Sequence, residues 1–385
     1  MQTPYFIFDE TSFSTNIGNF KKALNVHFNK SEIAYSVKTN SLPYIIKKAF
    51  STGMMIEISS FDEFALAKEL QIPINRIVYN GPYKDKNSFI EAVNCGAIVN
   101  IECSREIQWL NECKKNANVG IRINVDLKKI SPEDAKENEP LSRFGFNYEN
   151  KTLKNAISQI VEKNIMVSGI SVHKTSRTRS KEVYYNMAKY ISDILNDLKL
   201  NIDYIDIGGG FYGGGGDSLK PSYFDYSTAI FYGLGKWHNR KIIVEPGSAS
   251  IAAPVQFEMS VIDTKTINHE KYCCVDGSRL DIDPFFHKQS YDYKIGYSVG
   301  ERRIISKQYI TGPTCLESDV LFSIDNEKEL YIGDHITIYK VGAYTMTLTP
   351  NFIKMIPAVY ARKKNQMIEA RRRWTIKDYL QGNLK

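Results

Sequence analysis

The 385-residue chain is long enough for a large hydrophobic core and for two domains. Its hydrophobic content of 43% and charged content of 24% are ordinary for a globular enzyme, and the net charge of +7 favours anionic ligands only weakly. The basic run Arg371–Arg373 fits a solvated surface better than a nucleic-acid patch.

Targeting and redox signals point to the cytoplasm. The first ten residues lack a basic leader followed by an apolar core, so no export signal is expected there. No apolar run approaches the roughly 18–20 residues of a membrane span. Six cysteines without CxxC or zinc-finger spacing give no disulfide pattern. We therefore expect a reduced, cytoplasmic protein with neither a nucleic-acid nor a membrane partner.

Eight short apolar runs have the length of buried strands, and stretches with helical spacing of apolar residues lie between them. The predicted strands are residues 33–37, 53–58, 76–80, 96–101, 119–123, 166–172, 203–207 and 241–244. The predicted helices include residues 61–70, 106–115, 153–163 and 183–198. This alternation predicts an α/β fold with a parallel sheet, which we expect to close into a (β/α)8 TIM-type barrel; an open sheet is the alternative.

The pattern changes after about residue 255, where alternating stretches predict short strands separated by turns. We expect three parts: residues 1–24 as an N-terminal segment that joins a β domain through the strand at Tyr5–Phe8, residues 25–255 as the barrel, and residues 256–385 as the β domain, a sandwich or barrel.

Polar residues follow several of the predicted barrel strands. Lys38 closes the first strand, Glu57 the second, His173 the sixth, the glycines 208–210 the seventh and Glu245 the eighth. Active sites of barrels lie at the carboxyl ends of the strands. An amine, an imidazole, a glycine turn and a carboxylate at that end are the groups needed to hold an aldehyde cofactor that bears a phosphate.

Each group also has a structural interpretation. Lys38 is either a surface lysine or a desolvated amine suited to Schiff-base chemistry. Glu245 either keeps a pyridine nitrogen protonated or serves as a charge at the start of a short helix. His173 either stacks on a planar cofactor ring or is an ordinary structural histidine.

The glycines and the cysteine turn are similarly ambiguous. Gly208, Gly209 and Gly210 expose backbone N–H groups that suit a phosphate, although a glycine cluster alone is a weak signal. Cys315, in the polar turn 312–319, is either an inert thiol or a proton donor whose charge state Asp319 controls. No metal site is expected, because the six histidines are scattered and no His, Cys or carboxylate group has ligand spacing.

Taken together, these residues resemble the fold-type III PLP-dependent decarboxylases, which include the ornithine, diaminopimelate and carboxynorspermidine decarboxylases. The resemblance spans nearly the whole chain in order. Its main motifs are Tyr35-Ser36-Val37-Lys38-Thr39-Asn40, Ser142-Arg143-Phe144-Gly145, Glu245-Pro246-Gly247 and Val341-Gly342-Ala343-Tyr344-Thr345. It implies pyridoxal 5'-phosphate (PLP) as cofactor and a head-to-tail homodimer with two shared active sites.

The resemblance also implies a role for each matching residue. Lys38 would bind PLP covalently, Glu57 would lie behind the cofactor, His173 would stack on its ring and Glu245 would pair with its nitrogen. The other implied cofactor contacts are Arg143, Ser176, Gly208, Gly209, Gly210, Gly247 and Tyr344. The block contributed by the neighbouring subunit would hold Cys315 and Asp319, and Phe352 matches an aromatic residue of the substrate site.

The chain departs from the family pattern at several positions. Ser248 replaces the arginine that often follows Glu-Pro-Gly, and Leu316 replaces the acidic residue that follows the cysteine in ornithine decarboxylases. Asp283 stands where diaminopimelate enzymes have an arginine, and Asp292 resembles an aspartate that binds a distal amine. Leu316 is more similar to the carboxynorspermidine branch, and the two aspartates favour a substrate with an amine at its distal end.

The resulting hypothesis is PLP-dependent decarboxylation, in which Lys38 holds the cofactor and Cys315 returns a proton to the α-carbon. The substrate would be like ornithine, lysine or diaminopimelate, or a larger amine conjugate from a polyamine, siderophore or other specialised pathway. One alternative is an amino-acid racemase of the alanine racemase type, which would use a tyrosine base rather than the cysteine block. Another is a non-catalytic regulatory relative that binds a partner protein.

Overall fold

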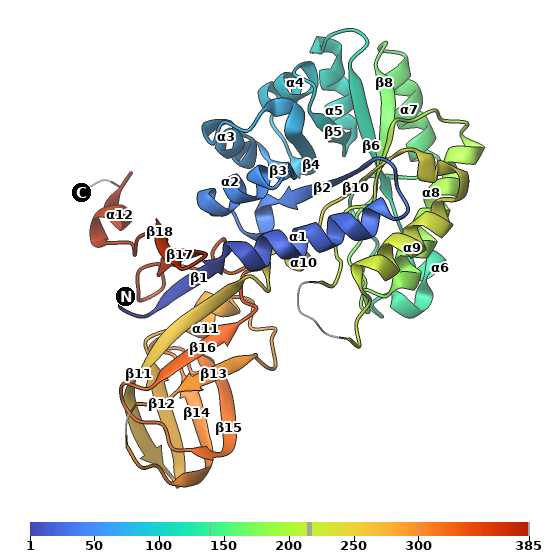
Figure 1. Ribbon diagram of the computed structural model, residues 1–385. Helices are drawn as coiled ribbons and strands as arrows, with labels where there is room; N and C mark the ends of the chain where they lie inside the picture. Colours follow the sequence, from blue (N-terminus) through green and yellow to red (C-terminus); the bar gives the residue numbers. More distant parts are fainter. Residues whose placement is uncertain (139, 214–217, 299, 384–385) are drawn as a thin grey trace. The chain divides into compact units, whose positions relative to one another are not determined.

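The computed structural model describes residues 1–138, 140–213, 218–298 and 300–383. They form two compact units (Figure 1). One comprises Thr15–Ser250, and the other combines Met1–Ser14 with Ile251–Lys385. Of the N-terminal segment 1–24, residues 1–14 thus fall in the second unit and the rest in the first.

The first unit is a closed barrel of eight parallel strands, which confirms the predicted (β/α)8 fold. The order around the barrel is β2-β3-β4-β5-β6-β8-β9-β10, and pairing of β10 with β2 closes it. The strands are β2 (Ser31–Ser36), β3 (Met55–Ser60), β4 (Ile77–Tyr83), β5 (Ile98–Ile101), β6 (Asn118–Asn124), β8 (Met166–Ser171), β9 (Tyr204–Asp206) and β10 (Lys241–Val244), with the short β7 (Phe146–Asn147) beside β6.

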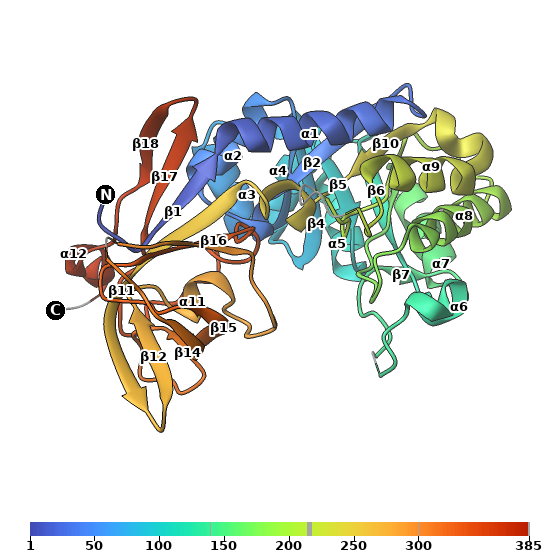
Figure 2. The ribbon, with the colours of Figure 1, turned by 60° about the horizontal axis from the view of Figure 1, so that its bottom comes forward.

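Helices lie outside the ring of strands in both ribbon views (Figures 1 and 2). They are α1 (Glu10–Asn25), α2 (Pro43–Ser51), α3 (Phe61–Glu69), α4 (Lys86–Asn94), α5 (Ser104–Trp109), α6 (Leu127–Ile130), α7 (Thr152–Val161), α8 (Lys181–Asp197), α9 (Tyr223–Leu234) and α10 (Ser248–Ile251). Four of these helices have an N-cap residue whose side chain accepts a hydrogen bond from a backbone N–H of the first turn. The N-caps of α3, α4, α8 and α9 are Ser60, Asp85, Ser180 and Ser222.

The predicted helix 106–115 is wrong in its second half. Helix α5 ends at Trp109, a single 3-10 turn covers Leu110–Glu112, and Cys113 is extended. The reason lies in the sequence, because Leu110 is the last buried apolar residue of this segment and residues 111–118 are mainly polar and exposed. Further helix would therefore have had no apolar face to bury.

A tyrosine fills the barrel interior near the amino-terminal ends of the strands. Tyr204 packs with Ala34, Met55, Val78 and Ile243 in a buried cluster. Gly169 on the neighbouring strand β8 and Gly120 on the next strand, β6, leave room for it, because a Cβ atom at either position would overlap the tyrosine side chain. The ring therefore explains both strand glycines, which would otherwise weaken β6 and β8.

The second unit is a mixed sheet that includes the N-terminal strand, as expected. β1 (Tyr5–Asp9) pairs antiparallel with β11 and parallel with β17. The other elements are β11 (Val255–Ile267), β12 (Glu270–Val275), β13 (Tyr293–Gly296), β14 (Ile304–Thr311), β15 (Val320–Lys328), β16 (His335–Tyr339), β17 (Ala358–Lys363), β18 (Gln366–Arg371), α11 (Arg279–Ile282) and α12 (Ile376–Leu380).

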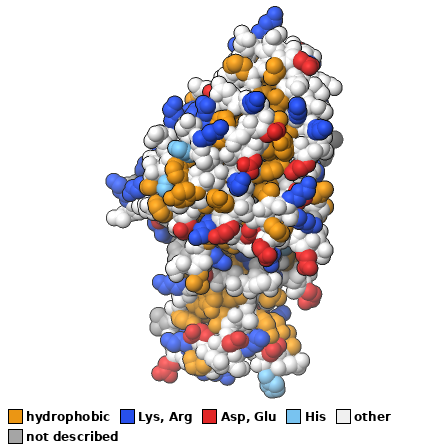
Figure 3. Space-filling view, turned by 90° about the vertical axis from the view of Figure 1, so that its right-hand side faces the viewer, with side chains coloured by type: hydrophobic (Ala, Val, Ile, Leu, Met, Phe, Trp, Pro, Cys, Tyr) orange, Lys and Arg blue, Asp and Glu red, His pale blue; other side chains and the backbone are white. Residues whose placement is uncertain are grey.

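Basic and acidic side chains are interspersed over the face of the molecule in Figure 3. Among the helices of the described ranges, none is both long enough and apolar enough to cross a bilayer. No three His, Cys, Asp or Glu side chains of the described residues cluster in a way that could hold a metal ion.

Candidate active site

A cavity of about 220 Å³ opens at the carboxyl ends of the barrel strands, where the sequence predicts the site. It brings together four of the predicted residues, Lys38, Glu57, His173 and Glu245. Its other lining residues are Ser59, Asn80, Gly81, Pro82, Arg122, Phe144 and Ser171.

Lys38 is ion-paired at one side of this cavity. It lies in a 3-10 turn (Val37–Thr39) directly after β2, and its Nζ is 2.5 Å from Glu57 Oε2 and 3.1 Å from Ser59 Oγ. Burial acts to raise the pKa of Glu57, but the Lys38 charge and hydrogen bonds from Lys38, Ser36 and Ser59 outweigh it, so this pKa is lowered. Glu57 is therefore a carboxylate that fixes the position of the Lys38 amine.

Glu245 has the opposite character. It follows β10, is buried, and its Oε1 accepts a hydrogen bond of 2.5 Å from Asn80 Nδ2. Burial, followed by the charges of Asp206 and Glu57, raises the pKa of Glu245 well above its ordinary value. The ionised form of Glu57, beside Lys38, and the neutral form of Glu245, beside Asn80, are therefore favoured.

His173 is held as a neutral ring. Its Nδ1 accepts the N–H of Gly209 at 3.0 Å, so the single proton of the neutral imidazole is on Nε2. Burial, followed by the charges of Lys38 and Arg122, lowers the pKa of His173 to about 3. The histidine is therefore a planar, uncharged surface at neutral pH.

Glycines 208–210 allow a tight backbone turn at the site, but most of their N–H groups are already hydrogen-bonded within the protein. Gly208 (φ 73°) and Gly210 (φ 92°) adopt left-handed conformations, and a Cβ atom at Gly208 would overlap the Val172 carbonyl. The Gly208 N–H is bound to Asp206 Oδ1 (2.9 Å), and the Gly209 N–H is bound to His173. Of the three backbone N–H groups, only that of Gly210 lacks an acceptor among the described residues.

Arg122 is a site residue that the sequence analysis missed. Its guanidinium group pairs with Glu102 (2.9 Å), donates to the His173 carbonyl (3.3 Å) and lies 4.7 Å from the centre of the Phe144 ring. It sits inside a predicted strand, and an apolar run buried on both faces does not reveal which residue points into the barrel. Asn80 appeared in the sequence only as the end of a strand.

Several predicted cofactor contacts are not among the residues that line the Lys38 cavity, including Arg143, Ser176 and Gly247. Arg143 lines a separate cavity of about 560 Å³ together with Asn124 and Asp126. Ser176 is buried, and its hydroxyl accepts the N–H of Arg179 at 2.8 Å. Gly247 packs closely on Thr39, since a Cβ atom there would lie 2.5 Å from Thr39 Oγ1. That Oγ1 is buried and has no hydrogen-bond partner among the described residues.

The remaining predicted residues belong to the second unit, where Asp319 organises the turn that carries Cys315. The Asp319 carboxylate is buried and accepts hydrogen bonds from Thr314 Oγ1 (2.6 Å), the Arg279 N–H (2.7 Å) and Ser278 Oγ (3.0 Å). Cys315 itself is exposed. Asp319 therefore supports the position of the thiol through backbone and hydroxyl contacts.

The two aspartates assigned to a distal amine differ in environment. Asp283 is buried and bound by Arg279 (3.0 Å) and by the N–H groups of His287 and Lys288. Asp292 is exposed and paired with Lys340 at 2.6 Å. Tyr344, with φ 57°, and Phe352 are exposed.

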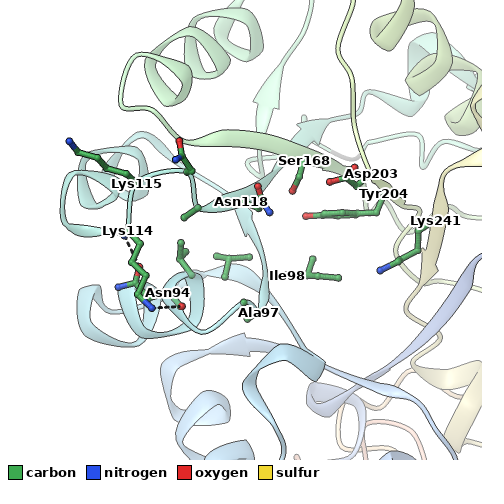
Figure 4. Close-up of a pocket in the computed structure, with 15 residues that line it drawn as sticks. Asn94, Ala97, Ile98, Lys114, Lys115, Asn118, Ser168, Asp203, Tyr204 and Lys241 are labelled. Carbon is green, nitrogen blue, oxygen red and sulfur yellow. Dashed lines mark hydrogen bonds between the residues drawn. The ribbon is translucent and has the colours of Figure 1, made fainter.

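A third cavity, of about 370 Å³, lies at the opposite end of the barrel, around the amino-terminal ends of the strands. In Figure 4 the Tyr204 ring extends between Ser168 and Ile98, with Lys241 nearby. None of the predicted site residues lines this cavity. It is larger than the Lys38 cavity but lacks the paired amine, imidazole and carboxyl groups, so we assign the chemistry to the carboxyl end.

Comparison with known proteins gives consistent matches. The family model described as the pyridoxal binding domain of pyridoxal-dependent decarboxylases matches residues 11–252. Diaminopimelate decarboxylase of Aquifex aeolicus is 25% identical over 98% of this chain and 90% of its own length. Ornithine decarboxylase of Mus pahari is 25% identical over 83% of this chain and 72% of its own length.

The fold is also found among solved structures. Diaminopimelate decarboxylase from M. jannaschii, crystallised with L-lysine, superimposes with a TM-score of 0.86 at 22% identity. The match covers all of this chain and 92% of that protein. A barrel combined with a β domain that uses the N-terminal strand is therefore an established architecture.

Proposed function

The chain belongs to the pyridoxal-dependent decarboxylase family, and on this premise we propose that it decarboxylates an amino acid that carries an amine at its distal end. It is a PLP-dependent carboxy-lyase that acts on an amino acid. The observation that carries the site assignment is the meeting of Lys38, Glu57, His173 and Glu245 around one cavity at the carboxyl end of the barrel.

The residues present fit PLP. Lys38 supplies the amine for its aldehyde, and the flat, neutral His173 suits one face of its ring. Glu245 offers a buried carboxyl for the ring nitrogen. Among the described residues the Gly210 N–H and the Thr39 Oγ1 have no hydrogen-bond partner, so both can donate to an anionic or polar group.

When bound, PLP supplies a ring that withdraws electrons from the α-carbon as carbon dioxide leaves. The chain's own residues do the rest. Glu57 orients the Lys38 amine through the 2.5 Å ion pair. Arg122, anchored by Glu102, supports the backbone carbonyl of His173. Arg143, Ser176, Gly247 and Tyr344 remain predicted cofactor contacts.

The substrate class is supported by the relatives, which are decarboxylases of diaminopimelate and ornithine. We retain Asp283, Asp292 and Phe352 as predicted contacts to the distal part of the substrate. Asp283 is already bound by one arginine and two backbone N–H groups, and the exposed Asp292 is already paired with Lys340, so an added ammonium group would displace a cation at either aspartate.

We also propose that two copies associate head to tail, so that Cys315 and Asp319 of one copy complete the site of the other. The exposed thiol of Cys315 is accessible to such a partner. Cytoplasmic localisation likewise stays a prediction, to which the six free cysteines lend support.

The direct test is release of carbon dioxide from L-lysine, L-ornithine, L-arginine and meso-diaminopimelate in the presence of PLP, with the amine product identified by mass spectrometry. We expect turnover of at least one of them and its loss in Lys38→Ala. Lys68→Ala, which removes an exposed lysine, should leave turnover intact. Loss of optical activity without carbon dioxide would instead indicate a racemase, and absence of PLP binding would revive the regulatory alternative.

A further inference from the structure

Three buried carboxyl groups meet in the barrel around two asparagines. Glu57 and Asp206 are 0% exposed and Glu245 is 5% exposed, and Lys38 and Arg122 are the cations that act on them. Lys38 pairs with Glu57, and Arg122 pairs with Glu102. Both cations are thus paired with carboxylates other than Asp206 and Glu245, and these two groups accept hydrogen bonds from neutral donors.

The asparagines have only one consistent orientation. The Tyr204 hydroxyl donates to Asn100 Oδ1 (2.9 Å), so Asn100 Nδ2 faces Asn80 Oδ1 (2.8 Å) and Asp206 Oδ2 (3.3 Å). Asn80 Nδ2 then donates to Glu245 Oε1 (2.5 Å) and to Glu57 Oε1 (3.3 Å). This directed chain runs from the tyrosine to the glutamates and fixes which oxygens are occupied.

Asp206 and Glu245 are neighbours through Gly208, whose carbonyl accepts the Glu245 N–H (2.7 Å) and whose N–H donates to Asp206 Oδ1 (2.9 Å), and their carboxyl groups lie close enough to hydrogen-bond. Two carboxyl groups in contact must share at least one proton, because two adjacent buried negative charges repel strongly. Asp206 is the better stabilised anion of the pair, since it receives the Gly208 N–H (2.9 Å) and the Asn100 amide. Burial raises the pKa of Asp206 only to about 6, whereas that of Glu245 is raised well above its ordinary value.

We propose that Asp206 is a positioning residue for Glu245: it accepts the hydrogen bond of a protonated Glu245 carboxyl and thereby keeps that acid neutral and oriented in the ligand-free protein. When the cofactor binds, the protonated Glu245 carboxyl would therefore be able to donate its proton to a basic ring nitrogen. The Glu245 O–H bond would break, a ring N–H bond would form, and a carboxylate would be left beside the ring cation, without uptake of a proton from solvent.

Only the proton transfer to the ring nitrogen rests on the proposed function. The protonation of Glu245 can be measured in the protein without any cofactor. The test is infrared spectroscopy of the ligand-free protein, in which a protonated carboxyl group has its own C=O stretch. We expect such a band in the wild type at neutral pH, and its absence in Glu245→Gln assigns it. Asp206→Asn removes the negative charge with little change in side-chain shape. In this variant the band should disappear at neutral pH, or the acid dissociation constant of Glu245 that it reports should rise at least tenfold.

The matched control is Asp203→Asn, an exposed aspartate at the other cavity of the same barrel (Figure 4), which should leave the band unchanged. A wild type without the band, or an Asp206→Asn protein with the wild-type band, would overturn the proposal. A second measurement on the wild type needs no variant: the band should vanish when PLP is added, and a pH indicator should report no proton uptake. If the band is present but survives PLP binding, the role of Asp206 stands and the assignment of Glu245 to the ring nitrogen fails.

Discussion

Replacement of Lys84 by methionine should destabilise the barrel, although Lys84 does not line the Lys38 cavity. Its side chain is fully buried, and its Nζ donates to the carbonyls of Gly81 (2.6 Å) and Asn100 (3.2 Å) and to Glu106 Oε1 (3.2 Å). Glu106 is equally buried. Methionine has a similar length but no charge, so Lys84→Met leaves Glu106 without its cation.

Removing one partner of a buried ion pair costs about 3–5 kcal/mol of unfolding free energy. The loss should also depend on pH. Burial already raises the pKa of Glu106 against the opposing charge of Lys84, and loss of Lys84 raises it further. When a carboxyl group has a higher pKa in the folded than in the unfolded state, the folded protein becomes less stable as pH rises. The difference in unfolding free energy between wild type and Lys84→Met should therefore grow above the wild-type pKa of Glu106, by at most about 1.4 kcal/mol per pH unit.

The assay is urea denaturation of the ligand-free protein, followed by circular dichroism at several pH values. The control is Lys84→Met combined with Glu106→Gln, which removes both charges and should recover most of the lost stability. A loss below about 1 kcal/mol, as for an exposed pair, would refute the assignment of a buried ion pair. So would a double variant that is less stable than Lys84→Met alone.

Three further predictions concern the histidine, a strand glycine and the dimer. Because the pKa of His173 is lowered to about 3, its ring should show no titration by NMR between about pH 5 and 8, where an ordinary histidine titrates; a normal midpoint would contradict its burial. Gly169→Ala should cost about 1–3 kcal/mol in urea denaturation, since its Cβ overlaps a tyrosine ring, whereas Gly18→Ala, with open space around it, should not destabilise; equal effects would count against the packing. If sites are shared between subunits, mixing inactive Lys38→Ala and Cys315→Ala proteins should restore about a quarter of wild-type turnover, and no recovery in demonstrably mixed dimers would exclude sharing.

The barrel could be predicted from the sequence because each of its eight strands is an apolar run that ends in a polar or glycine residue. That pattern also located Lys38, Glu57, His173 and Glu245, since strand ends in a parallel barrel meet at one face. The predicted helix 106–115 is longer than the observed helix, because the residues after Leu110 have no apolar face to bury in the core.

The polar network within the barrel could not be predicted in the same way. Asn100, Arg122 and Asp206 lie inside strands, and sequence alone does not say whether such a residue points into the barrel or toward the helices. The roles of Gly208 and Gly209 also depended on structure, because their N–H groups serve Asp206 and His173. Arg143 lines a different cavity from Lys38, a placement set by loop conformation rather than by strand register.

The central claim is that the amine of Lys38 binds the cofactor. Its most direct test is incubation of the purified protein with PLP, reduction with borohydride and peptide mass spectrometry. We predict one pyridoxyl group per chain, on the peptide that contains Lys38, and loss of this label in Lys38→Ala. A stoichiometric label on another lysine, or none at all, would contradict the account.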